Sequence, residues 1–67
     1  MRYVEYKALI QTALKRNRNG LTWAQLKEKL DLPYQRACPQ WTKRMESEIG
    51  LTRSKGETGR AYVWKLK

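Results

Sequence analysis

The sequence predicts a small α+β domain in which three helices are followed by a two-stranded β-hairpin. Three observations lead to this prediction. Apolar residues recur at helical spacing in the first half of the chain. Pro and Gly residues divide the chain into short segments, and the last segment alternates around a glycine-containing turn. Since 67 residues are enough for one hydrophobic core and too few for two, we expect one domain over residues 1–67.

The first predicted helix spans about residues 2–18. Its apolar residues recur at the three-and-four spacing of one helical face: Tyr3, Tyr6, Leu9, Ile10, Ala13 and Leu14. Asn19 and Gly20 follow, and both tolerate the positive φ that commonly ends a helix. We therefore expect this face to enter the core and the helix to end near Asn17 to Asn19.

The second predicted helix spans about residues 23–31 and follows a short extended piece, Leu21 and Thr22. Thr22 can cap the free amides of this helix, and Gln25 lies at the spacing that completes a capping box. Pro33 is expected to end it, because the residue before a proline is pushed out of the helical region. The apolar positions on its inner face are Trp23, Leu26 and Leu30.

The third predicted helix spans about residues 35–49, and Pro39 leaves its start open. Pro39 would disrupt the interior of a helix that begins at Tyr34, but it suits the first turn of one that begins near Cys38. The helix therefore starts late or starts with an irregular turn. The face expected in the core carries Cys38, Trp41, Met45 and Ile49. The opposite face carries Arg36, Gln40, Lys43, Arg44 and Ser47.

Residues 51–66 are predicted to form a β-hairpin with a charged tip. Gly50 is a natural stop for the preceding helix, and strand-forming residues flank a turn that contains Gly56 and Gly59. Five aromatic or apolar residues are expected to build the core rather than to stack on bases: Tyr62, Trp64 and Leu66 on one strand face, with Trp23 and Trp41.

Positive charge dominates the composition, with 15 Lys and Arg against 6 Asp and Glu, a formal net charge of +9 and a pI of about 10.1. This balance indicates a polyanionic partner, nucleic acid first. The chain has no His and a lone Cys38, which we expect to be a small core residue. It offers no zinc-ligand set and no catalytic nucleophile with its base, so we expect no enzyme activity, cofactor or metal. No stretch approaches the length of a membrane span, and we expect a cytoplasmic, nucleoid-associated protein.

Several short motifs follow one another in a defined order. They are LTWAQL at residues 21–26, LDLP at 30–33, ESEIGL at 46–51, glycines at 56 and 59, and YVW at 62–64. Together they resemble the winged helix-turn-helix DNA-binding domain superfamily, in particular small single-domain prokaryotic or archaeal transcriptional regulators. The resemblance implies sequence-specific binding of double-stranded DNA and transcriptional regulation. It also implies that the third helix is a recognition helix in the major groove, with the hairpin as a basic wing on phosphates or in the minor groove.

The outward face of the third helix carries the residues expected to contact DNA. Gln40 and Arg44 are the best candidates for reading base edges, with Arg36 close behind, because Gln pairs with adenine and Arg with guanine through two hydrogen bonds. Lys43 and Ser47 suit phosphates or either role. The contacts expected from the hairpin are Arg53, Lys55 and Arg60.

Two features depart from the pattern of the family. Pro39 lies inside the stretch that should carry recognition, and Glu46 and Glu48 place negative charge toward its end. Either feature could mean a shifted or shortened recognition helix. Arg44 could also hold a phosphate, or pair with Glu48 four residues on as a surface ion pair.

Two other function classes stay open. An RNA-binding module would use the same basic charge, and an exposed Tyr or Trp platform on the sheet would favour it. A protein-interaction module would keep the fold and use Tyr3, Tyr6 or Trp64 as a patch for a dimer or another partner. A homodimer is possible for the DNA-binding domain as well.

Overall fold

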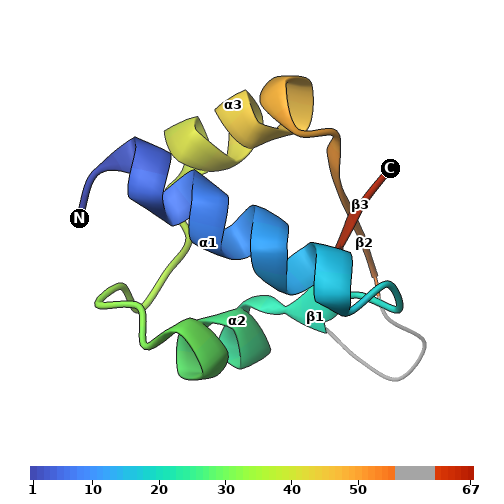
Figure 1. Cartoon of the computed structure of the whole chain (residues 1–67), viewed down its shortest axis with the longest axis horizontal. Coiled ribbons are helices and arrows are strands. Elements are labelled where there is room, and N and C mark those ends of the chain that lie inside the picture. Colours follow the sequence, from blue (N-terminus) through green and yellow to red (C-terminus); the bar gives the residue numbers. More distant parts are fainter. Residues whose placement is uncertain (56–61) are drawn as a thin grey trace.

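The computed structural model describes residues 1–55 and 62–67. Within these ranges three helices and three strands form a small α+β fold. In chain order they are α1 (Tyr3–Arg16), β1 (Leu21–Thr22), α2 (Trp23–Leu30), α3 (Pro39–Glu48), β2 (Leu51–Lys55) and β3 (Tyr62–Leu66). Figure 1 shows α1 crossing the middle of the molecule, with α3 on one side of it, α2 on the other and the sheet near its C-terminal end.

Helix α1 presents most of its predicted apolar face to the core. Tyr6, Ile10, Ala13 and Leu14 are buried, and the helix ends at a cap on Asn17, as predicted. Leu9 is 37% exposed, so its predicted place in the core is wrong. The apolar stripe is wider than the surface that the rest of the fold covers, and Leu9 lies at its edge.

Helix α2 begins with the predicted capping box. The Thr22 hydroxyl accepts a hydrogen bond from the Gln25 amide at 3.2 Å, and the Gln25 side chain accepts one from the Thr22 amide at 2.9 Å. These bonds satisfy amides that have no partner within the helix. At the other end Asp31 caps the helix in the left-handed region with a φ of 51°, two residues before Pro33.

Helix α3 begins at Pro39, so the predicted start at residue 35 is wrong and the late start is confirmed. Cys38 is its N-cap, and the first helical bond runs from the Thr42 amide to the Cys38 carbonyl at 2.9 Å. Pro39 has no amide hydrogen to lose and its fixed φ suits the first helical position, whereas the residue before it is kept extended. Arg36 consequently lies in the segment before the helix, not on its face.

The sheet has three antiparallel strands in the order β1, β3, β2, where two were expected. The short extended piece before α2 pairs with β3, Leu21 opposite Trp64 and Thr22 opposite Val63. Strand β2 pairs with the other edge of β3 through Leu51 to Lys55. A two-residue strand is too short to show alternation in the sequence. Its pairing with β3 therefore depends on the tertiary fold and could not be predicted from local pattern.

The core lies where α1, α2 and α3 meet the inner face of the sheet. Trp64 is 2% exposed, and Trp23 and Trp41 are half-buried against the core cluster. Tyr62 is 50% exposed, so its predicted core position is wrong, and Cys38 is only half-buried. Thr42 is buried although it is polar; its hydroxyl donates to the Cys38 carbonyl at 2.7 Å.

Candidate nucleic-acid interface

One face of α3 is polar and open to solvent. Gln40, Lys43 and Ser47 are all exposed, and their spacing of three and then four residues places them in one row along the helix. Met45 and Thr42 hold the opposite face in the core. The packing of Met45 and Thr42 therefore orients this row toward solvent.

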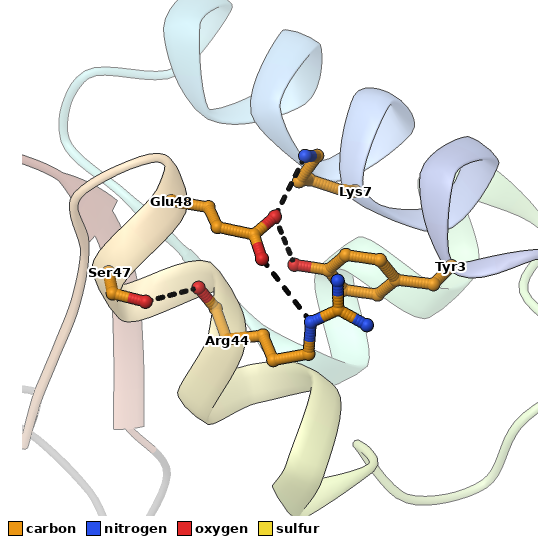
Figure 2. A network of polar contacts seen from close by, with 5 residues as sticks. All are labelled: Tyr3, Lys7, Arg44, Ser47 and Glu48. Atoms are coloured by element: carbon orange, nitrogen blue, oxygen red, sulfur yellow. Dashed lines mark hydrogen bonds and ion pairs between the residues drawn. The ribbon is translucent and has the colours of Figure 1, made fainter.

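Arg44 lies beside this row and is directed toward α1 (Figure 2). Its Nε donates to Glu48 Oε2 at 3.2 Å, and its guanidinium carbon lies 4.1 Å from the centre of the Tyr3 ring. The side chain is still 58% exposed. The ion pair with Glu48 that the spacing allowed is thus present, and Arg44 occupies the flank of the polar row.

Glu48 links α3 to α1. Besides Arg44, it accepts hydrogen bonds from Lys7 Nζ at 2.9 Å and from the Tyr3 hydroxyl at 3.0 Å (Figure 2). The hydrogen bonds from Lys7 and Tyr3, and to a lesser degree from Arg44, hold the pKa of this carboxyl below its ordinary value of 4.5. The pKa of Tyr3 is raised, by burial first and then by its bond to Glu48.

Glu46 is paired on the other side of α3, with Arg53 of β2 at 3.3 Å. The two acids that seemed to oppose binding of a polyanion are therefore both engaged with cations, one toward α1 and one toward the sheet. Neither belongs to the row of Gln40, Lys43 and Ser47. The outward surface of α3 keeps one positive charge and two neutral polar groups.

Two cations of β2, Arg53 and Lys55, lie on the helix side of the sheet. Arg53 pairs across the strands with Trp64, and Lys55 pairs with Tyr62. Side chains alternate along a strand, so Arg53 and Lys55 share the face of the buried Leu51. Both side chains are exposed.

A groove of about 400 Å³ lies between the sheet and the segment that joins α2 to α3. Arg36 and Arg53 both line it, together with Tyr62 and Trp64. The Arg53 guanidinium carbon lies 5.8 Å from the centre of the Trp64 ring. Arg36 was predicted on the recognition helix, but it lies in the segment before α3. There it lines this groove together with Arg53 of β2.

The predicted site residues consequently fall into three places. Gln40, Lys43 and Ser47 lie together on α3, and Arg44 lies at their flank. Arg36 and Arg53 line the groove, and Lys55 ends β2. Arg60 lies outside the described residues. The exposure of Tyr62 was not predicted from the sequence; the signal for it is the position of Tyr62 at the very start of β3.

Two of the three residues suggested for a protein-interaction patch are buried. Tyr6 is 1% and Trp64 2% exposed, so neither can contact a partner, and Tyr3 is half-buried. In the described part of the chain, no helix combines the length and the apolar character needed to cross a lipid bilayer. Nor do residues 1–55 and 62–67 contain a group of three or more His, Cys, Asp or Glu side chains that could hold a metal ion.

Comparisons with protein-family profiles, with characterised proteins and with solved structures found no match to this chain.

Proposed function

We propose that this protein is a winged helix-turn-helix domain that binds double-stranded DNA and regulates transcription. The observation that carries the proposal is the polar row Gln40, Lys43 and Ser47 on α3, packed rigidly from behind and flanked by cations. The ion pair between Glu46 and Arg53 ties the hairpin to α3, so helix and hairpin cations neighbour one another. A net charge of +9 supplies the attraction to a polyanion.

Helix α3 has a suitable length and chemistry for the major groove. Its 10 residues span about 15 Å at 1.5 Å each, nearly three turns. Gln40 lies in the first turn of α3, and recognition helices contact base edges through their N-terminal residues. Its side-chain amide can form two hydrogen bonds with adenine. Lys43 and Ser47 follow on the same row and suit a base or a phosphate.

The flanking cations suit the DNA backbone. Arg36, Arg53 and Lys55 would neutralise phosphates on the β2 side of α3. Arg60, which lies outside the described residues, stays a proposed contact from the sequence. On the other side, Arg44 is already engaged by Glu48, so we now assign it a phosphate contact in place of base reading. A duplex-binding regulator of this kind would act at the nucleoid in the cytoplasm, as a monomer or as a symmetric dimer.

The test is a binding titration with duplex DNA, duplex RNA and single strands, each at two salt concentrations. Duplex DNA should bind best, and Lys43→Ala should weaken its binding. Lys29→Ala is the matched control, because Lys29 is an exposed lysine of α2, on the opposite side of α1 from α3 (Figure 1). Equal losses in both variants would indicate attraction to total charge and would remove α3 from the interface.

A second candidate is binding of single-stranded nucleic acid, and Tyr62 favours it. Tyr62 is 50% exposed and lines the groove beside Arg36 and Arg53, an arrangement in which a base could stack while its phosphate meets a guanidinium. If this candidate is right, single strands outcompete duplex DNA. Tyr62→Ala should then weaken their binding by about 1–3 kcal/mol while Tyr62→Phe retains it.

A further inference from the structure

The groove beside Tyr62 rests on two stacked indole rings. Trp23 of α2 and Trp64 of β3 lie 5.5 Å apart between ring centres, and their planes differ by 29°. The Trp23 indole NH donates to the Gln35 carbonyl at 3.0 Å, which ties the segment between α2 and α3 to these rings. The small residues Ala24 and Ala37 line the groove as well. The floor of the groove is therefore apolar, and contacts within the protein hold it in place.

The opening of the groove, unlike its floor, presents polar and charged groups to solvent. Tyr62 is 50% exposed, and Gln35 and Arg36 are exposed as well. The Arg53 side chain is 38% exposed and gives one nitrogen to Glu46, whereas a guanidinium carries five N–H donors. A ring, an amide and two cations are thus accessible around one groove of about 400 Å³.

The groove lies beside the polar row of α3. Arg53 lines the groove and pairs at 3.3 Å with Glu46, the residue before Ser47 of the row. At the other end of α3, Arg36 lies shortly before Pro39, where the helix begins. A DNA molecule on the row would therefore lie next to the groove.

We propose that the groove holds one unpaired base of DNA next to the duplex on α3, an inference that rests on the function proposed above. An unpaired base can leave the stack and lie against an aromatic ring, which Tyr62 supplies. The amide of Gln35 can bond the edge of an adenine twice, and Arg36 and Arg53 would hold the flanking phosphates. The groove volume is near the lower end of the roughly 300–1,000 Å³ of small-ligand sites, which suits a single base.

The test compares three forms of one short duplex: fully paired, with one extra adenine in one strand, and with an abasic site in place of that adenine. The two bulged duplexes have the same number of phosphates, so their difference isolates the base. The wild-type protein should bind the adenine bulge about 5-fold or more tightly than the abasic bulge. Tyr62→Ala should remove this preference, and Tyr62→Phe, which keeps the ring, should retain it. Val4→Ala, at a 68% exposed position of α1, is the control and should retain it too.

Gln35→Ala tests the edge contact separately from stacking. It should lower the preference for an adenine bulge over a guanine bulge, while most of the preference for adenine over the abasic site remains. If the wild-type protein binds the fully paired duplex but does not distinguish the adenine bulge from the abasic one, this inference is overturned and the proposed function stands. Failure of all three duplexes to bind would overturn both. A full preference in Tyr62→Ala would also overturn the inference, because the ring would then have no part in holding the base.

Discussion

Gly20 and Gly50 both have positive φ angles, +92° and +71°, but their surroundings differ. A Cβ on Gly20 would collide with Val63 and lie 2.9 Å from the Trp64 carbonyl oxygen, whereas at Gly50 the nearest atom, Lys67 Cβ, would be 3.4 Å away. We expect Gly50→Ala to cost about 1–2 kcal/mol for the left-handed conformation alone, and Gly20→Ala to cost clearly more. Urea unfolding of the two variants checks this, and equal losses would contradict the close packing of Gly20 on β3.

Trp41 joins the aromatic groups of α1 to α3. Its ring lies 5.5 Å from Tyr3 and 5.0 Å from Tyr6, centre to centre. Trp41→Ala should lower the free energy of unfolding by about 3 kcal/mol, the low end for a buried Trp because this one is half-buried. Tyr62→Ala, at a half-exposed site, is the control and should cost less than about 1 kcal/mol. Similar melting temperatures for Trp41→Ala and wild type would show that the ring adds nothing to the core.

Residues whose structure is decided locally were predictable from the sequence. The capping box of Thr22 and Gln25 and the fit of Pro39 to a first helical turn depend on neighbours a few residues away. The exposure of Leu9 and Tyr62 depends on how far other elements extend over α1 and β3. Local periodicity contains no information on that extent, so both residues were wrongly placed in the core.

At the scale of elements, Glu48 connects α1 and α3 and makes their contact depend on pH. Its folded-state pKa is lowered, chiefly by the hydrogen bond from Lys7, so its contribution is complete above the ordinary pKa of 4.5 and is lost as pH falls through the lowered value. Glu48→Gln should therefore melt below wild type near neutral pH, and the gap should close as pH falls below 4.5. A gap that is constant over this range would show that the charge of Glu48 does not matter. The same comparison in a Lys7→Ala background should show a weaker pH dependence.

The elements themselves were largely predictable, and the exceptions have physical causes. Helices α1 and α2 follow their periodicity and their end signals, and strands β2 and β3 lie within the predicted range 51–66. The start of α3 stayed open between a late start and an irregular first turn, and the helix starts late, with Pro39 at its first position. The pairing of β1 with β3 could not be predicted, since two residues contain no strand pattern. In the candidate site, the row on α3 could be predicted from helical spacing. The groove that Arg36 and Arg53 both line could not, because the two residues come together only in the tertiary fold.

For the whole molecule, the surplus of positive charge predicts that binding to DNA weakens as the salt concentration rises. Each phosphate contact should add a fixed amount to the slope of log K against log salt concentration. Lys55→Ala should lower the slope of log K against log salt concentration by about 0.9, the value for one lost phosphate contact on duplex DNA. Binding to unrelated duplex sequences should weaken to the same extent. An unchanged slope would place the end of β2 outside the interface.

The central claim is that DNA contacts the polar row of α3 and the neighbouring hairpin cations, and NMR mapping of the backbone amides during a titration with duplex DNA tests it most directly. We predict the largest shifts at Gln40, Lys43 and Ser47, with further shifts at Arg53 and Lys55, and small changes over the exposed part of α2. Shifts confined to α1 and α2, with α3 unaffected, would contradict the account.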